Sequence, residues 1–158
     1  MHKFNWKPYA GWILLTEAVG GLSGLLTRAG MRQYAEQTAK PPLTPPPWVF
    51  PVAWGILYAL MGAAAARISR MPRGPQRSRN LTLYLLQLGV NFFWSIIFFS
   101  WRLYGGALLW LGGLWLLVLW LLLILRRQDP TAAKLLIPYQ LWLTFALYLN
   151  FGVFLLNR

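Results

Sequence analysis

Few side chains in this sequence can take part in acid–base, nucleophilic or metal chemistry. The chain has no cysteine, a single histidine, His2, and three acids, Glu17, Glu36 and Asp129. The missing thiols exclude disulfides, thiolate nucleophiles and cysteine-based metal or iron–sulfur sites. A lone histidine at the N-terminus cannot build a cluster of metal ligands, and a pair of catalytic carboxylates is not expected. We therefore predict no metal site and no required cofactor.

The remaining candidates for chemistry are aromatic rings and amides, which are suited to binding flat ligands. The chain has ten tryptophans, and Trp54, Trp94 and Trp142 lie deep inside apolar runs. These three rings either pack in the interior or frame a flat apolar pocket. Gln87 and Asn91 stand four residues apart, so they share one helix face. Their amides either bridge neighbouring helices or offer hydrogen bonds to a ligand.

The elements that hold these residues are apolar enough to cross a membrane. The chain is 58% hydrophobic and only 11% charged, whereas a soluble domain has about 25% charged residues. Five apolar runs can each be extended to the roughly 20 residues that cross a hydrocarbon core, and helices satisfy their own backbone groups in lipid. We predict one domain, residues 1–158, that is an all-α integral membrane protein. Its five-transmembrane-helix bundle is expected at about residues 9–28, 47–69, 80–101, 104–126 and 131–156.

The longest connection is predicted at about residues 29–46. It contains several prolines between residues 41 and 47, so it must be irregular there. Residues 31–38 allow a short helix before these prolines. The first apolar run has a second interpretation, as a signal peptide, but Glu17 interrupts it and no A-x-A cleavage site follows. We therefore expect an uncleaved helix.

Glu17 is the one acid inside an apolar run, so burying it in lipid is costly, by roughly 2.5–3.5 kcal/mol on insertion scales. It should face the interior of the bundle. On a helix it shares a face with Gly20, Gly21, Gly24 and Arg28, and the small Gly20-x-x-x-Gly24 stripe allows close helix approach. Glu17 is either a structural acid bonded to a neighbouring helix or a residue that lines a polar ligand cavity.

Lysines and arginines gather between the apolar runs, where membrane topology accounts for the net charge of +12. Ten of them fall in the N-terminal segment and in the second and fourth connections, and five on the other side. This excess predicts a cytoplasmic N-terminus and an outside location for the long first connection. The lipid bilayer is the expected partner of this surface. Nucleic acid is not expected, because the chain has no basic helix or aromatic sheet motif.

Three motifs carry a resemblance to a known family. Residues 32–62 read RQYAEQTAKPPLTPPPWVFPVAWGILYALMG, residues 87–99 read QLGVNFFWSIIFF, and residues 135–150 read LLIPYQLWLTFALYLN. In the same order, these are similar to the patterns R-W-Y-x-x-L-x-K-P-x-W-x-P-P-x-W-V, Q-L-x-x-N-x-x-W-x-x-x-F-F and L-L-x-P-Y-x-x-W-x-x-x-A-x-x-L-N. The chain therefore resembles the TspO/MBR family, that of the translocator protein, peripheral-type benzodiazepine receptor and tryptophan-rich sensory protein, and looks like a bacterial member.

The resemblance implies a five-helix bundle in the bacterial cell membrane, often a homodimer, whose first loop covers a ligand pocket. Family members take porphyrins, haem, sterols and benzodiazepine-type ligands. Carried over by motif position, the pocket residues are Tyr34, Pro45, Trp54, Asn91, Trp142 and Ala146. To these we add Gln87 and Glu17 from their helical positions. Arg28, Arg32 and Lys40 at the pocket mouth are expected to meet porphyrin propionates.

Two departures from the family pattern concern the loop. Gln33 and Leu43 stand where the family has tryptophan, so the loop is less aromatic. The sterol-type pattern is also incomplete, because the first basic residue after Tyr148 is Arg158, and the pattern is weak evidence even when present. Sterol binding is therefore not supported by this motif.

Three functions remain open. The first is a membrane receptor, sensor or carrier that binds tetrapyrroles such as protoporphyrin IX and haem, without axial ligation of haem iron by histidine or cysteine. The second is a light- and oxygen-dependent enzyme that degrades protoporphyrin, in which Trp54 and Trp142 would be the catalytic residues and the pigment the photosensitiser. The third is a structural membrane protein that binds a protein partner.

Overall fold

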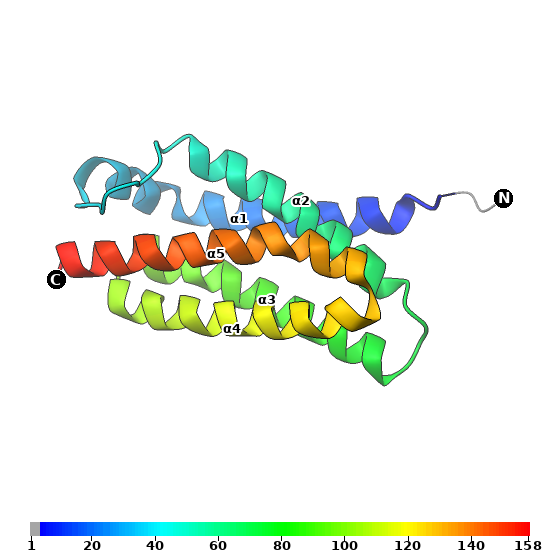
Figure 1. Ribbon diagram of the computed structural model, residues 1–158. Coiled ribbons are helices and arrows are strands. Elements are labelled where there is room, and N and C mark those ends of the chain that lie inside the picture. Colours follow the sequence, from blue (N-terminus) through cyan, green and yellow to red (C-terminus); the bar gives the residue numbers. More distant parts are fainter. Residues whose placement is uncertain (1–3) are drawn as a thin grey trace.

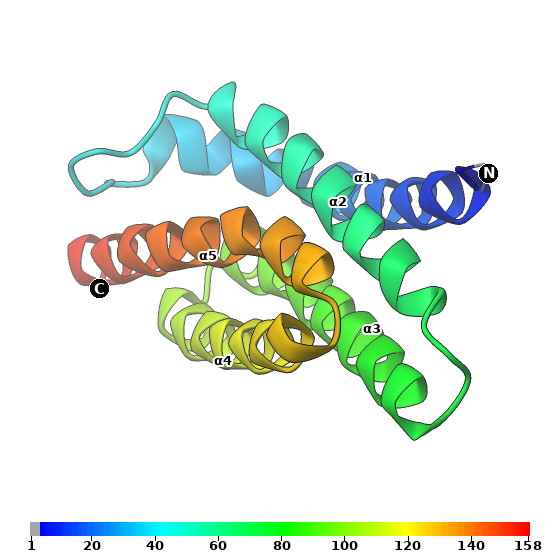
Figure 2. The same ribbon diagram turned by 45° about the vertical axis from the view of Figure 1, so that its right-hand side comes forward.

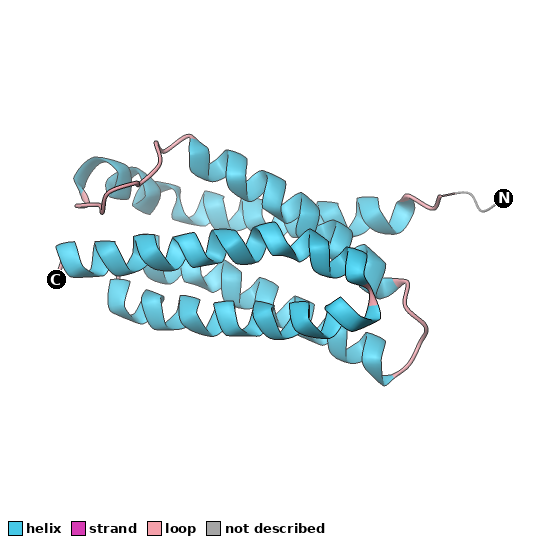
Figure 3. Ribbon diagram, viewed as in Figure 1, coloured by secondary structure: helices cyan, strands magenta, loops and turns pink. Residues whose placement is uncertain are grey.

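The computed structural model describes residues 4–158 and consists of five long helices joined by short connections (Figure 1). His2 and Lys3 lie outside the described residues. The elements are α1 (Lys7–Gln37), α2 (Val49–Ser69), α3 (Pro75–Ser95), a π-helical segment η1 (Ile96–Ser100), α4 (Tyr104–Gln128) and α5 (Pro130–Leu156). Between residues 4 and 158 there is no strand (Figure 3). Five helical segments are long and apolar enough to cross a membrane, which confirms the predicted fold class.

The first helix is longer than the sequence suggested. It continues to Gln37 rather than ending at about residue 28, so the connection expected at residues 29–46 is confined to residues 38–48. The polar residues after Arg28 contain no proline before Pro41, so nothing in the backbone chemistry ends the helix earlier. Tertiary contacts hold this last stretch in place, because the Tyr34 ring packs against Phe98 and Phe99 at 5.6 and 5.4 Å.

Local chemistry explains where two other helices begin. Pro75 and Pro130 are the first residues of α3 and α5, the position where the missing N–H of proline costs nothing. At α5 the Asp129 side chain accepts a hydrogen bond from the Ala132 N–H at 3.2 Å and so caps the helix. The same carboxylate pairs with Arg67 of α2 at 3.0 Å, which ties the start of α5 to the end of α2.

The helices run between two ends of different chemistry (Figures 1 and 2). One end holds residues 38–48, which we call the lid, together with the turn between η1 and α4 and the C-terminal end of α5; we call it the lid end. The other end holds the start of α1 and the α2–α3 and α4–α5 connections. We call it the basic end, because it carries a set of cationic side chains, Lys7, Arg67, Arg70, Arg73, Arg77, Arg79, Arg126, Arg127 and Lys134.

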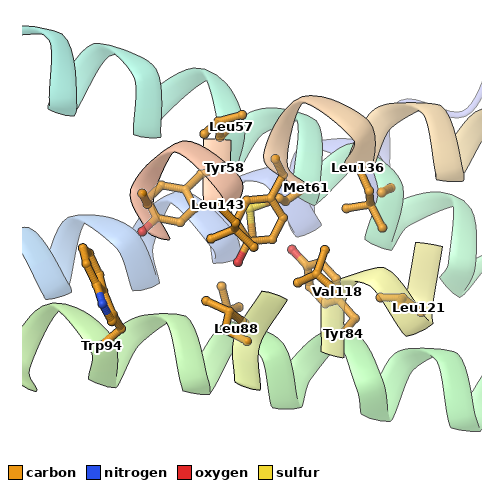
Figure 4. Close-up of a cluster of buried hydrophobic side chains, with 14 of the residues drawn as sticks. Leu57, Tyr58, Met61, Tyr84, Leu88, Trp94, Val118, Leu121, Leu136 and Leu143 are labelled. Carbon is orange, nitrogen blue, oxygen red and sulfur yellow. The ribbon is translucent and has the colours of Figure 1, made fainter. Parts of the chain in front are cut away.

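The core lies between α2, α3, α4 and α5. Leu88 of α3, Val118 of α4 and Leu143 of α5 gather in its centre, all at most 4% exposed (Figure 4). Toward the basic end, α1 and α2 touch directly. A Cβ atom added to Gly62 would lie 2.5 Å from the Ile13 Cα atom, so only glycine allows this approach. Toward the lid end the same two helices line a cavity.

Candidate ligand-binding site

A cavity of about 850 Å³ lies inside the lid half of the bundle. Its walls come from α1, α2, the junction of α3 with η1, and α5, and residues of the lid cover it. The lining is mainly apolar and aromatic, with a few polar groups. This size and chemistry are typical of small-molecule binding sites.

Six of the eight residues predicted from the sequence line this cavity. They are Glu17, Tyr34, Pro45, Trp54, Trp142 and Ala146. They come from three helices and the lid, so the fold brings together positions that are up to 129 residues apart in the chain. The other two, Gln87 and Asn91, do not line it and lie in the core behind it.

Two tryptophans form one corner of the cavity. The rings of Trp54 and Trp142 meet edge to face, with centroids 6.2 Å apart at 81°. Trp54 also stacks on Tyr58 at 5.3 Å, and Phe50 meets Trp142 edge to face at 6.2 Å. Such edge-to-face and offset contacts hold aromatic rings in fixed orientations. The corner therefore presents rigid aromatic edges and faces to the cavity.

The amides of Gln87 and Asn91 connect three helices. Tyr58 of α2 donates to Asn91 Oδ1 at 3.2 Å, and Asn91 Nδ2 donates to the Tyr139 hydroxyl of α5 at 2.8 Å. Tyr139 in turn donates to Gln87 Oε1 at 2.8 Å. Of the two interpretations of these amides, the structure therefore supports helix bridging. Asn91 does not line the cavity, but the ring of its partner Tyr58 does.

Glu17 and three glycines of α1 share one helix face, as the helical spacing predicted, and this face borders the cavity. Gly20, Gly21 and Gly24 line it beside Glu17, whereas Arg28 is exposed and lies off the cavity. Gly20 is needed for packing, because a Cβ atom there would lie 2.1 Å from the Tyr58 ring. At Gly21 and Gly24 an added Cβ atom would meet no described atom within 4 Å. In the Gly20-x-x-x-Gly24 stripe, Gly20 therefore makes room for the Tyr58 ring, and Gly24 borders open space in the cavity.

The lid end of the cavity carries one cationic group. Lys40 lines the cavity, and its Nζ lies 5.0 Å from the centre of the Tyr34 ring. Nζ also donates to the carbonyls of Ala35 at 3.1 Å and Thr38 at 2.9 Å, where a cation is favourable because helix carbonyls are unpaired. Arg32, predicted beside Lys40 at the mouth, does not line the cavity.

The lid is fastened to α5. The Asn157 Nδ2 donates to the Ala39 carbonyl at 2.8 Å, and the Ala39 N–H donates back to Asn157 Oδ1 at 3.2 Å. The Tyr148 hydroxyl donates to the Pro42 carbonyl at 2.7 Å. Pro41 also packs so closely on Gly152 that a Cβ atom there would lie 2.5 Å from the proline ring. The lid thus has both polar and steric contacts that hold it over the cavity.

Five further aromatic residues line the cavity and were not among the eight predicted site residues. These are Phe50, Tyr58, Trp94, Phe98 and Phe99, of which only Trp94 was named from the sequence as a ring that could frame a pocket. The π-helical turn of η1 places Phe98 and Phe99 together against Tyr34, and such turns are frequent at functional sites. The Phe98–Phe99 pair ends the second sequence motif, and this motif position could have identified both as site residues. Trp94 is fixed by its Nε1–H, which donates to Asn150 at 3.1 Å.

A second, smaller pocket of about 320 Å³ lies at the basic end. It is lined by Tyr9, Arg67, Arg70, Met71 and Asp129. The Arg67–Asp129 ion pair and the hydrogen bond from Arg67 to the Tyr9 hydroxyl at 3.3 Å occupy most of its polar groups. Among residues 4–158 there is no group of three or more His, Cys, Asp or Glu side chains that could hold a metal ion.

Comparison of the sequence with known proteins identifies its family. The sequence model of the TspO/MBR family matches residues 8–156. The chain is 35% identical to the Translocator protein of Bos taurus over 97% of this chain and 92% of the relative. It is 35% identical to Protein CrtK of Rhodobacter capsulatus, over 89% of this chain and 87% of that protein. It is 33% identical to the Tryptophan-rich protein TspO of Chlorobaculum tepidum over 89% of each chain. These matches confirm the resemblance seen in the motifs.

Proposed function

The chain belongs to the TspO/MBR family of membrane proteins, and from this premise we propose that it is a receptor, sensor or carrier for tetrapyrroles such as protoporphyrin IX and haem. Other flat apolar molecules of similar size would use the same site. Relatives named Translocator protein and Tryptophan-rich sensory protein agree with a carrier or a sensor.

The observation that carries this proposal is the aromatic cavity under the lid. Its volume of about 850 Å³ is within the range of pockets that enclose small organic ligands. The Trp54–Trp142 corner offers ring edges and faces to a flat π-system. An apolar macrocycle would be removed from both water and lipid there, and the lid would cover it.

Lys40 gives the proposed site a positive charge at the lid end. Its Nζ is the cation that lines the cavity at the lid end, and it would pair with a propionate of the bound pigment. Arg28 and Arg32, which the sequence placed at the mouth as well, lie off the cavity lining. The proposed orientation therefore has the acidic edge of the ligand toward the lid.

Titration of the purified protein with protoporphyrin IX, followed by tryptophan quenching, tests the proposal. We expect saturable quenching in the wild type and about tenfold weaker binding in Trp142→Ala, because one aromatic wall of the corner is lost. Trp120→Ala is the matched control, since Trp120 is 55% exposed on α4 and away from the cavity. Absence of saturable quenching in the wild type would reject tetrapyrrole binding.

The tryptophan corner also favours a second candidate function, the light- and oxygen-dependent degradation of protoporphyrin. Trp54 and Trp142 are in edge-to-face contact and both line the cavity, so a bound pigment excited by light would lie beside oxidisable indoles. In Trp142→Phe we expect slower pigment loss in light with binding retained, and in Trp120→Phe no change. An unchanged rate of light-dependent loss in Trp142→Phe would remove Trp142 from this role.

Location and assembly follow as part of the same proposal. We place the protein in the bacterial cell membrane as a homodimer, with the basic end and the N-terminus in the cytoplasm, because basic residues remain on that side. The chain has no cysteine, so Ser78→Cys at the basic end and Thr44→Cys in the lid can be labelled separately in intact cells. Labelling of Ser78→Cys from outside would reverse the orientation.

Two further results concern assembly. A monomer mass in mild detergent would reject the dimer, and a stable protein partner with no bound pigment would favour the structural function.

A further inference from the structure

Several polar groups that face the cavity already have partners within the protein. The Tyr58 hydroxyl donates to Asn91, and the Trp94 indole donates to Asn150. The Lys40 ammonium donates to two helix carbonyls, and the Thr44 hydroxyl donates to the Pro41 carbonyl at 2.7 Å. These groups shape the cavity, but much of their hydrogen-bonding capacity is already used.

Glu17 is different. Its carboxyl group makes no hydrogen bond and no ion pair with any side chain in residues 4–158, where the one ion pair joins Arg67 and Asp129. It lies ten residues into α1, about 15 Å along the helix axis, so it sits deep in the hydrocarbon layer. An acid at this depth faces a bundle interior or a water-filled space and normally has a partner. The partner of Glu17 is not supplied by the described protein.

The wall around Glu17 has room for such a partner. Gly21 and Gly24 of α1 and Gly55 of α2 all line the cavity, and an added Cβ atom at any of them would meet no described atom within 4 Å. Three neighbouring positions without side chains leave space for a ligand group to approach the carboxyl oxygens. Of the two interpretations of Glu17 from the sequence, this geometry favours the cavity-lining one.

The cavity therefore has opposite charges at its two ends. Lys40 lies over Tyr34 at the lid end, and Glu17 precedes Tyr34 by 17 residues of the same continuous helix, which corresponds to about 25 Å along the axis. A ligand with a cationic or N–H-bearing group would be attracted to the Glu17 end, and an anionic group would be repelled from it. The aromatic walls between the two ends also attract a cation over their faces, so the contribution of Glu17 has to be separated from theirs by a variant.

From this arrangement we propose that Glu17 is a specificity-determining residue, whose carboxyl oxygens accept hydrogen bonds from an N–H or ammonium group of the ligand. The inference deepens the proposed function, because it concerns which flat ligands the same cavity selects. It predicts a preference for ligands that combine an apolar ring system with a hydrogen-bond donor or a positive charge, over ring systems of equal size without one.

Three fluorescent probes of similar shape test this preference. They are 9-aminoacridine, which is a cation with N–H donors, uncharged anthracene, and anthracene-9-carboxylate. The protein is placed in nanodiscs of zwitterionic phosphatidylcholine, and empty nanodiscs correct for partition into lipid. We expect the wild type to bind 9-aminoacridine about tenfold more tightly than anthracene, the scale of a hydrogen bond to a charged group. Anthracene-9-carboxylate can pair with Lys40 at the lid end, so we expect its affinity to be unchanged or slightly higher in Glu17→Gln.

Glu17→Gln is the decisive variant, because it keeps the size of the side chain and removes its charge. The preference for 9-aminoacridine over anthracene should fall about tenfold, to near one, while anthracene affinity stays unchanged and reports an intact cavity. Glu36→Gln is the matched control: Glu36 lies on the same helix, is exposed and does not line the cavity. It should keep the wild-type preference.

The proposal is overturned if the wild type shows no preference, if Glu17→Gln keeps it, or if both probes weaken equally in Glu17→Gln. The test is separable from that of tetrapyrrole binding. A Glu17-dependent preference without saturable protoporphyrin binding would reject the proposed function and keep the role of Glu17. Saturable protoporphyrin binding with an unchanged preference in Glu17→Gln would support the proposed function and reject the role of Glu17.

Discussion

The two halves of this bundle are built from the same helices and differ in what fills the space between them. In the basic half, α1 touches α2 through Gly62, and Ala64, Ala65 and Ala66 have no exposed surface. In the lid half, the same pair of helices borders a cavity of about 850 Å³, where Gly21 and Gly24 contact no neighbouring helix. Gly62 therefore allows α1 and α2 to touch in the basic half, whereas Gly21 and Gly24 leave space beside the cavity in the lid half.

This difference indicates how a small membrane protein keeps a large cavity open. A close contact and an ion pair fix the basic half, so the lid half can leave apolar walls unpacked without the helices collapsing onto each other. Stability and binding are thus placed in different parts of the chain. Substitutions in the basic half should then change stability, and substitutions in the lid half should change ligand binding.

Gly62→Leu should have the largest effect. A Cβ atom at this position would lie 2.5 and 2.8 Å from the Ile13 Cα and N atoms, and backbone atoms cannot move aside as a flexible side chain can. We expect a loss of about 3 kcal/mol of stability from overpacking, seen as a lower Tm in detergent by circular dichroism. Gly113→Leu on the exposed face of α4, where an added Cβ meets no described atom within 4 Å, is the control. Equal Tm values for the two variants would contradict the contact.

Asp129→Ala should come next. It removes the cap of α5 and leaves Arg67 without its ion-pair partner, so we expect a loss of about 2 kcal/mol. Chemical denaturation measures this, and Arg127→Ala, an exposed neighbour, should change stability by less than about 0.5 kcal/mol. Because Asp129 belongs to the basic half, the affinity for protoporphyrin IX should stay unchanged. A parallel loss of affinity would show that the halves are coupled.

Gly24→Leu makes the same exchange as Gly62→Leu in the other half and should have the opposite consequence for stability. Leucine forms helix better than glycine by about 0.8 kcal/mol, and an added Cβ meets no described atom within 4 Å, so Tm should rise or stay the same. The leucine side chain would occupy part of the cavity, and we expect about tenfold weaker binding of protoporphyrin IX. Unchanged affinity would mean that the ligand does not use this part of the cavity.

Asn157→Ala should give the smallest effect. It removes both hydrogen bonds between Asn157 and Ala39, so the lid opens more readily and ligand leaves about threefold faster, the scale of a net hydrogen bond. Stopped-flow displacement measures the release rate. Arg158→Ala, an exposed neighbour of Asn157, should release ligand at the wild-type rate. Identical rates in Asn157→Ala and the wild type would remove the lid from the release step.

The sequence predicted the fold well where lipid alone dictates structure and less well where tertiary contacts decide. The apolar length of the runs was enough to identify five helices. The last turns of α1 fall in the predicted connection, where the sequence allowed a separate short helix at residues 31–38. Their continuity with α1 is supported by Tyr34, which packs against Phe98 and Phe99 of η1. The π-helical turn itself has no local signal, because residues 96–100 read like any apolar helix.

The site was predicted in a similar way. Motif positions identified Trp54, Trp142 and Ala146, which share the cavity. Motif position also assigned Asn91 to the pocket, but Asn91 does not line the cavity. An amide on a helix face can point to a ligand or to a neighbouring helix, and here it bonds to the hydroxyls of Tyr58 and Tyr139. Which basic residue faces the cavity was also open until the lid placed Lys40 over Tyr34.

The fastening of the lid to Asn157 also has a consequence for biosynthesis. Ala39 and its partner are 118 residues apart in the chain, so the ribosome needs about 12 s between them at roughly 10 residues per second. For most of that interval α1, the lid and α2 have been made, but the contact that fastens the lid does not yet exist. The nascent protein therefore passes through a stage with an uncovered aromatic surface, during which a pigment present at the insertion site could be enclosed as the last helix arrives.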